Sequence, residues 1–204
     1  MSQEKLYYQN LLERNKSQVN KIILASTSPR RKELLEKAGI DFQIDASSIE
    51  EIMDEILPLE ERLIDLAISK GEPIHQKYPY DIVISADTIV YYQDQVIGKP
   101  KDEQDARVIL EKLSQSCHSV YTAVAIYFKD DLVSFVEQTD VYFKDISFLL
   151  DDYMASKEWI GKAGGYAIQG RAGEFIDHIV GDRDNVIGLP LQRVVNILKE
   201  KNAI

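Results

Sequence analysis

The stretch KIILASTSPRRKELLEKAGI, residues 21–40, decides the start of the fold because it reads as a buried strand, a tight turn and a helix. The apolar residues 22–24 are typical of a strand that is covered on both faces. Ser28 followed by Pro29 predicts a helix that begins at Pro29, with the Ser28 hydroxyl as its N-cap. The stretch therefore predicts a strand–turn–helix unit that ends near Gly39.

The joint between this strand and this helix is strongly basic. Arg30, Arg31 and Lys32 occupy the first helical turn, where the helix dipole is already positive and acidic residues are favoured. With the hydroxyls of Ser26 and Ser28 and the backbone amides of the helix start, the arginines indicate a site for a phosphate chain. A solvated basic helix end is the alternative interpretation.

The bulk properties describe a soluble globular protein and exclude several classes. The chain has 204 residues, of which 45% are hydrophobic and 28% charged. A net charge of -10 argues against partners such as nucleic acid or an anionic membrane. A single cysteine, Cys117, excludes an internal disulfide and fits a reducing cytosol. Neither a secretory signal nor a long apolar run occurs, so we expect a cytoplasmic protein.

A carboxylate interrupts the most apolar strand of the chain. The run DIVISADTIVYY, residues 81–92, predicts a central strand with Asp87 and Thr88 in its middle. Burying a carboxylate is costly unless it has a partner. Asp87 therefore marks either a structural hydrogen bond or a site that handles a metal or a proton, and we favour the functional interpretation.

Two lysines attract attention for different reasons. Lys99 lies between Gly98 and Pro100, two residues that constrain the backbone on either side of it. Lys70 ends a helix expected over residues 58–70, where a lysine is favourable without any function. Taken alone, Lys70 reads as a surface charge.

Half of the ten glycines lie in GKAGGYAIQGRAG, residues 161–173, which implies close backbone approach or left-handed turns. Gln169 lies among them, and its amide can both donate and accept hydrogen bonds, as recognition of a nucleobase edge requires. The alternative is a glycine-rich hairpin loop without a ligand.

The remaining elements follow from periodicity and turn signals. We expect no histidine metal site, since the three histidines are scattered, and His118 reads as structural. The other predictions are an amphipathic helix within residues 1–20, strands over 41–46, 119–128, 132–143 and 175–180, and helices over 102–112, 148–160 and up to 198.

Five ordered motifs together resemble the Maf family of nucleoside triphosphate pyrophosphatases, over about residues 21–200. They are Ser26-x-Ser28-Pro29-Arg30-Arg31, Ser85-Ala86-Asp87-Thr88, Gly98-Lys99-Pro100, Lys162-Ala163-Gly164-Gly165-Tyr166-x-Ile168-Gln169-Gly170 and Asn185-Val186-Ile187-Gly188-Leu189-Pro190. The resemblance implies one catalytic domain, residues 21–204, after an extension, residues 1–20. It also implies an α/β fold with a mixed sheet, two lobes and a nucleotide cleft between them.

The family further implies a homodimer and metal-dependent hydrolysis of a nucleoside triphosphate to the monophosphate and pyrophosphate. By resemblance, Asp87 is the proton acceptor that activates water. Glu50 joins it at a Mg²⁺ or Mn²⁺ ion, with Glu51 as the alternative ligand. The residues that resemble those holding the triphosphate are Ser26, Arg31, Lys70 and Lys99.

The choice of substrate depends on Arg30, Thr88 and Gln169, which resemble the branch acting on dTTP and UTP rather than the branch acting on 7-methyl-GTP. Tyr121-Thr122-Ala123-Val124 agrees with that branch, and Gly165 and Ser69 are small departures from the family pattern. The sequence leaves open whether modified pyrimidine nucleotides are substrates. A non-catalytic nucleotide sensor that regulates septum formation is the alternative function.

Overall fold

The structure is a computed structural model that describes residues 20–48 and 56–204. The helix predicted within residues 1–20 and the predicted metal ligand Glu50, with its alternative Glu51, lie outside these ranges. The division into an extension, residues 1–20, and one domain, residues 21–204, therefore stays a prediction.

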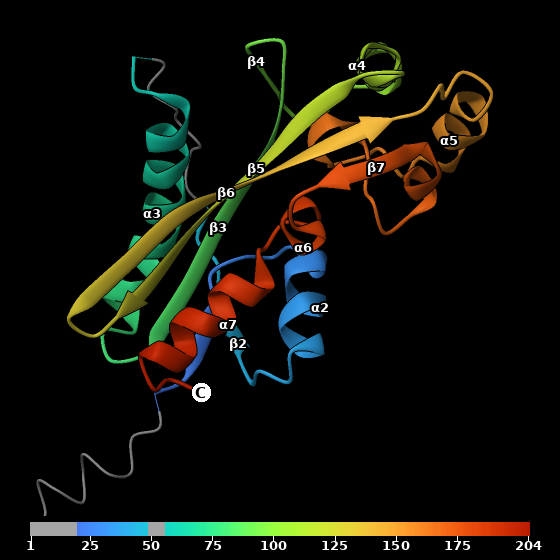
Figure 1. Ribbon diagram of the computed structural model, residues 1–204. Coiled ribbons are helices and arrows are strands. Elements are labelled where there is room, and N and C mark those ends of the chain that lie inside the picture. The colour runs from blue at the N-terminus through green and yellow to red at the C-terminus, as the bar shows by residue number, and fades with distance from the viewer. Residues whose placement is uncertain (1–19, 49–55) are drawn as a thin grey trace, which may run out of the picture.

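In the described ranges, seven strands form one mixed sheet with the order β2-β1-β3-β5-β6-β7, and β4 also pairs with β3 (Figure 1). β1 is parallel to β2 and β3, and the other pairs are antiparallel. The predicted strand over 41–46 is reduced to two residues. The strands are β1 (Ile22–Leu24), β2 (Gln43–Ile44), β3 (Ile82–Tyr92), β4 (Gln95–Ile97), β5 (Cys117–Phe128), β6 (Asp131–Phe143) and β7 (Ile176–Val180).

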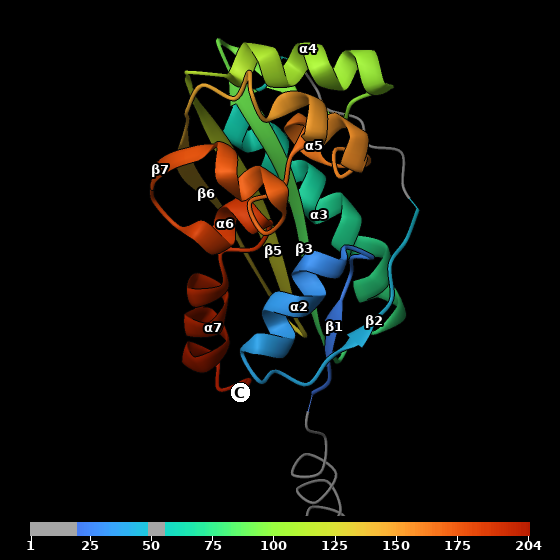
Figure 2. The same ribbon diagram turned by 90° about the vertical axis from the view of Figure 1, so that its right-hand side faces the viewer.

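Helices cover both faces of this sheet, as Figure 2 shows for α3 behind the strands and α2 and α7 in front. The helices are α2 (Pro29–Lys37), α3 (Leu59–Lys77), α4 (Glu103–Leu113), α5 (Leu150–Ser156), α6 (Arg183–Ile187) and α7 (Leu191–Glu200). Successive side chains of β1 point to opposite faces of the sheet. Ile23 therefore packs in an apolar cluster under α3, and Ile22 packs in another apolar cluster under α2 and α7. This arrangement confirms the predicted α/β class. None of the helices in the described part of the chain has the length and apolarity required to cross a membrane.

The face opposite α3 carries two apolar clusters, one toward each end of the long strands, and Ile176, Ile179 and Val186 pack against both. β3 contributes Ala86 to the cluster under α2 and α7, and Val90 to the cluster under α4 and α5. Between them on the same face lies Thr88, and on β5 Thr122 separates Val120 from Val124 in the same way. A polar seam thus divides two apolar lobes, as the family resemblance implied.

Two helices differ from their predicted bounds. The prediction ended α3 at Lys70, but the helix continues to Lys77 because Gly71 and Ile74 extend its buried side against the sheet, despite Pro73. Lys70 therefore lies inside the helix and not at its end. The helix predicted over 148–160 is only α5, and Lys157 terminates it by adopting a left-handed φ of 58°.

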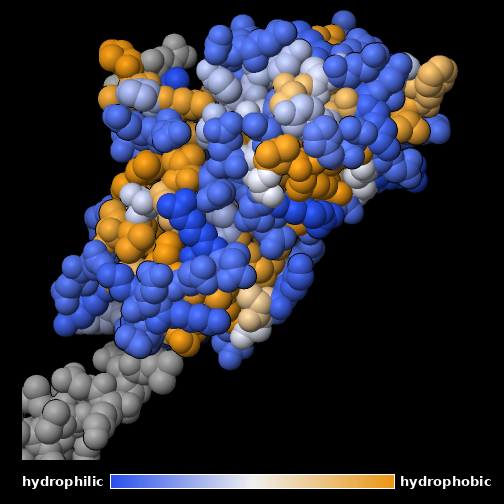
Figure 3. Space-filling view, viewed as in Figure 1, coloured by the Kyte–Doolittle hydropathy of each residue, from blue (hydrophilic) through white to orange (hydrophobic). Residues whose placement is uncertain are grey.

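Apolar side chains also reach the surface at one edge of the sheet. Figure 3 shows apolar residues in two areas of the face seen in Figure 1, one on the left of the view in the region of α3 and β6 and one over β7. β7 is the last strand in the sheet order, and its Val180 is 56% exposed. This edge is a surface on which another protein could pack.

Candidate active site

The candidate site lies at a gap along one edge of β3. β5 pairs with residues 83–91 of β3 and occupies the other edge. On the open edge, β1 pairs only with residues 82–84 and β4 only with residues 90–92. In the described part of the chain, no strand therefore pairs with residues 85–89 of β3 on this edge. A ligand here would meet both faces of the strand at the carboxyl end of β1, which is the common ligand position in open α/β sheets.

A cavity of about 580 Å³ opens at this gap, which is the size of a small-molecule site. Every predicted site residue that the structure describes lines it, although these residues come from segments far apart in the sequence. They are Ser26, Arg30, Arg31, Lys70, Asp87, Thr88, Lys99 and Gln169.

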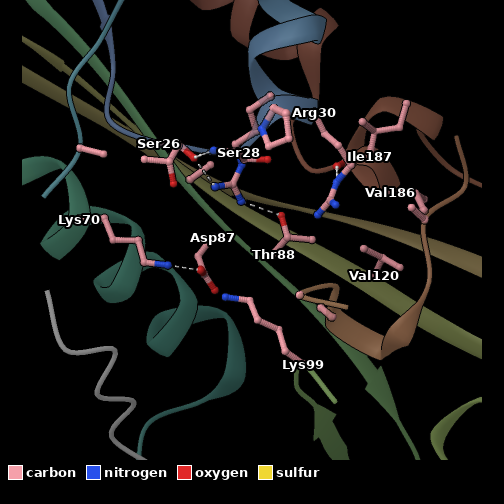
Figure 4. A pocket seen from close by; sticks show the side chains of 18 of the residues that line it. Ser26, Ser28, Arg30, Lys70, Asp87, Thr88, Lys99, Val120, Val186 and Ile187 are labelled. Carbon is pink, nitrogen blue, oxygen red and sulfur yellow. Dashed lines mark hydrogen bonds and ion pairs between the residues drawn. The ribbon is translucent and has the colours of Figure 1, made fainter. Parts of the chain in front are cut away.

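Asp87 and Lys70 form an ion pair on the α3 side of the sheet. The side chains are only 12% and 17% exposed, so the lysine compensates the cost of burying the carboxylate. In Figure 4 the amino groups of Lys70 and Lys99 both point toward the Asp87 carboxylate. The two cations and the carboxylate form a charged end of the cavity.

Arg31 lies on the other side of β3 and links three segments of the chain. Its guanidinium donates from Nε to Gly188 O at 2.8 Å, from Nη1 to Ser26 Oγ at 3.0 Å and from Nη2 to Thr88 Oγ1 at 3.1 Å. Arg30 similarly donates from Nε to Ile187 O at 3.2 Å. The sequence indicated only a phosphate opposite these cations, but the backbone carbonyl oxygens of Ile187 and Gly188, where α6 ends, also face them. The contacts with carbonyl oxygens are compatible with a phosphate site, because both arginines also line the cavity.

The start of α2 differs from the prediction in one detail. The helix begins at Pro29, but the Ser28 hydroxyl makes no capping hydrogen bond within the described residues. Instead, Ser26 Oγ accepts a hydrogen bond from the Ser28 amide at 3.2 Å, and the Ser28 side chain lines the cavity. Proline at the first helical position does not explain this, because an N-cap hydroxyl bonds to the amide of the second or third helical residue.

The glycine-rich segment forms two 3₁₀ turns, η1 (Ala163–Gly165) and η2 (Arg171–Phe175), and not a hairpin. Gly164 has a φ of +67°, and an added Cβ would lie 2.8 Å from Val90 Cγ2. Its amide donates to Gly98 O at 3.0 Å, beside Lys99. The segment that presents Gln169 is therefore tied to the segment that presents Lys99.

The sequence did not reveal how the site is supported, although Thr122, Asn185, Ile187 and Gly188 belong to motifs that resemble the family. Thr122 and Asn185 are fully buried, and the carbonyl oxygens of Ile187 and Gly188 hold the arginines. A signal was present, since Asn185 is a polar residue beside the apolar run 186–189, but its partners belong to distant strands. Ser47 and Ser48, which also line the cavity, carried no signal of their own.

Two basic groups near the end of the cavity opposite Asp87 have lowered pKa values. Burial lowers the pKa of Arg30, and the charge of Glu33 opposes this shift. Burial, together with the nearby Arg30 charge, lowers the pKa of Lys162. Arg30 lines the cavity, whereas Lys162 lies beside it, between the lining residues Gly161 and Ala163.

Asp87 fits part of a divalent cation site. Within residues 20–48 and 56–204, no group of three acidic, histidine or cysteine side chains is placed to hold a metal ion. Mg²⁺ commonly needs only one or two carboxylates, with phosphate oxygens and water completing its shell. The Asp87 carboxylate, inside a cavity that Arg31, Lys70 and Lys99 also line, is compatible with that ligand set.

Comparison with known proteins agrees with this geometry. Residues 21–201 match the family model described as Maf-like protein. A dTTP/UTP pyrophosphatase of Bacillus cereus (strain AH820) is 45% identical over 185 residues, which cover 90% of this chain and 97% of that protein. A dTTP/UTP pyrophosphatase of Bacillus anthracis is 44% identical with the same coverage. The chain belongs to the Maf family.

Proposed function

We propose that the protein is a nucleoside triphosphate pyrophosphatase that hydrolyses dTTP and UTP to the monophosphate and pyrophosphate. The observation that carries the proposal is the Asp87 carboxylate, buried between the amino groups of Lys70 and Lys99 in a cavity that Arg31 also lines. The names of the relatives at 44–45% identity support the reaction and the substrates. Modified pyrimidine nucleotides are candidate substrates as well.

The cavity has two chemically different ends, which orient the nucleotide. Figure 4 shows Lys70, Asp87 and Lys99 at one end and Val120, Val186 and Ile187 at the other. We assign the triphosphate to the charged end, where Ser26, Arg31, Lys70 and Lys99 would bind its oxygens. The base then lies toward the apolar end, where Arg30, Thr88 and Gln169 would recognise its polar edge.

Asp87 would act as the general base. Its carboxylate would accept a proton from the water that attacks the phosphoanhydride between the α- and β-phosphates, and the lysines would stabilise the charge that develops on the phosphate oxygens. We propose that Asp87, with Glu50 or Glu51, holds a divalent cation such as Mg²⁺ or Mn²⁺. When bound, that cation supplies Lewis-acid polarisation of the phosphates.

The test is the release of pyrophosphate from a panel of dTTP, UTP, CTP, dATP, GTP and 7-methyl-GTP with Mg²⁺ or Mn²⁺. We expect turnover of dTTP and UTP by the wild-type protein and at least a hundredfold slower turnover by Asp87→Asn. Asp131→Asn is the matched control, because Asp131 pairs with Lys201 at the tip of the β5–β6 hairpin. Tight nucleotide binding without turnover by the wild-type protein would favour the nucleotide sensor instead.

We also propose that the protein is a cytoplasmic homodimer. The resemblance to the Maf family supports the dimer, and the apolar residues over β7 in Figure 3 offer surface for such a contact. Light scattering after size exclusion tests it, since a mass of about 23.3 kDa would show a single chain.

A further inference from the structure

Two threonine hydroxyls face each other in the polar seam between the lobes. Thr88 of β3 and Thr122 of β5 are direct partners in the sheet, and their Oγ1 atoms are 2.9 Å apart. Thr88 lines the cavity, whereas Thr122 is fully buried and is absent from the described residues that line it. Thr122 can therefore influence a ligand only through Thr88.

The partners at the two ends of this pair fix the direction of its hydrogen bonds. At one end, the Arg31 guanidinium can only donate, and its Nη2 lies 3.1 Å from Thr88 Oγ1. At the other end, the backbone carbonyl oxygen of Asn185 can only accept, and it lies 3.1 Å from Thr122 Oγ1. Thr122 therefore gives its hydrogen to Asn185 and accepts the hydrogen of Thr88.

The other protein oxygen near the Thr88 hydroxyl is a weaker acceptor. Gly188 O lies 3.5 Å from Thr88 Oγ1, at the limit of hydrogen-bond length, and already accepts from Arg31 Nε at 2.8 Å. Thr122 is therefore the main acceptor of the Thr88 hydrogen, and a lone pair is what Thr88 offers to the cavity. Thr88 is then an acceptor toward a ligand and not a donor.

The carbonyl that ends this chain of hydrogen bonds is held rigidly. Asn185 is fully buried, and its Nδ2 donates to Val120 O at 3.1 Å and to Thr139 Oγ1 at 3.0 Å. Thr139 Oγ1 in turn lies 3.0 Å from both the amide and the carbonyl oxygen of Asp182, just before α6. The backbone oxygen of Asn185 also accepts from the Gly188 amide at 3.0 Å. The acceptor for Thr122 is therefore fixed by both the backbone and the side chain of Asn185.

We infer that Thr122 is a positioning residue, which holds Thr88 as a hydrogen-bond acceptor and so selects bases whose ring nitrogen carries a hydrogen. Uracil and thymine carry a hydrogen on N3, whereas N3 of cytosine is an acceptor. With CTP, Thr88 Oγ1 and N3 of cytosine would be two acceptors facing each other. Neither would then have a hydrogen-bond donor, which disfavours CTP. The inference rests on the proposed function, because it concerns the base end of that site.

The test compares UTP with CTP in Thr122→Val, which removes the hydroxyl while keeping the shape of the side chain. The Thr88 hydrogen is then released from Thr122 and can turn toward an acceptor on the ligand. We expect the ratio of kcat/KM for UTP over CTP to fall about tenfold. Thr122→Ser, which keeps the hydroxyl, should restore the wild-type ratio. Tyr127→Phe is the matched control, since it also removes a hydroxyl from β5. The Tyr127 hydroxyl donates to Ile68 O at 2.7 Å, away from the cavity.

Binding of the α,β-imido analogues of UTP and CTP, measured by calorimetry, separates this inference from the proposed reaction. A lower preference for the UTP analogue in Thr122→Val supports the inference even if the wild-type protein hydrolyses no nucleotide. An unchanged preference, or an equal loss for both nucleotides, overturns it and leaves the pyrophosphatase proposal intact. A change of the ratio in Tyr127→Phe as large as that in Thr122→Val would also overturn it. If neither analogue binds to the wild-type protein, both proposals fail.

Discussion

Lys70 of α3 forms an ion pair with Asp87 of β3 inside the cavity, where both side chains are mostly buried. The helix packs against the strand through Leu63 and Ala67, which share an apolar cluster with Val83 and Ile89. The ion pair therefore depends on the packing of α3 on the sheet. It joins the residue proposed as general base to a residue proposed to bind phosphate.

The first prediction concerns this ion pair. Lys70→Met keeps the length of the side chain and removes its charge, so Asp87 loses a buried counter-charge. We expect the free energy of unfolding to fall by about 1–3 kcal/mol and kcat/KM for UTP to fall at least about tenfold. Urea unfolding and steady-state kinetics measure the two effects.

Lys77→Met is the matched control on the same helix. Lys77 pairs with Asp45 at the surface, where its side chain is 59% exposed. Its loss should change neither stability nor activity appreciably. Equal effects of the two substitutions would contradict the role of Lys70.

The second prediction concerns Arg31, whose hydrogen bonds to Gly188 O, Ser26 Oγ and Thr88 Oγ1 require the planar guanidinium. Arg31→Lys keeps the charge but cannot reproduce this geometry. Loss of charge-assisted contacts should lower kcat/KM for UTP and dTTP by the equivalent of about 1.5–3 kcal/mol. The neighbouring Lys32 pairs with Glu36 at the surface, so Lys32→Ala should retain wild-type kinetics. Unaltered kinetics of Arg31→Lys would refute the role.

The third prediction concerns the close approach of α3 to the sheet. A Cβ on Gly71 would lie 2.5 Å from Tyr127 Cε2 and 2.6 Å from Ser85 Oγ, both in buried side chains. Gly71→Ala should push α3 away from β3 and move Lys70 from Asp87. We expect a loss of about 1–3 kcal/mol of stability together with reduced activity.

Gly98→Ala is the comparison for this substitution. No described atom lies within 4 Å of a Cβ at Gly98, and its φ is not in the left-handed region. The added methyl group should therefore leave stability nearly unchanged. A stable and fully active Gly71→Ala protein would show that α3 tolerates displacement.

The fourth prediction concerns pH. Burial lowers the pKa of His118 from 6.5 to about 4, and the charge of Asp140 opposes this shift. The unfolded chain takes up the proton near pH 6.5, whereas the folded protein does so only near pH 4. Stability from this group is therefore complete above pH 6.5 and decreases as the pH falls toward 4, by about 3 kcal/mol in total.

His118→Gln isolates this contribution, because glutamine does not titrate. We expect its free energy of unfolding to fall less than that of the wild-type protein between pH 6.5 and pH 4, as measured by urea unfolding at each pH. The carboxylates that titrate in the same interval are common to both proteins and cancel in the difference. Parallel curves for the two proteins would contradict the prediction.

The sequence by itself determined the elements that local chemistry controls. The apolar run 22–24, Pro29 and the interrupted strand around Asp87 predicted the unit that carries the site. The described residues predicted for the site all line one cavity, although Lys70 was singled out only by the family resemblance. Their catalytic and binding roles stay predictions, as does the metal site at Glu50.

Only the tertiary structure decided how these residues are held. Whether Lys70 is a surface charge or the partner of Asp87 depends on how α3 packs on the sheet, and the pattern of a single helix does not contain that information. The carbonyl oxygens of Ile187 and Gly188 bind the arginines across 157 positions of the chain. Backbone oxygens carry no sequence signal, so contacts of this kind appear only when distant segments fold together.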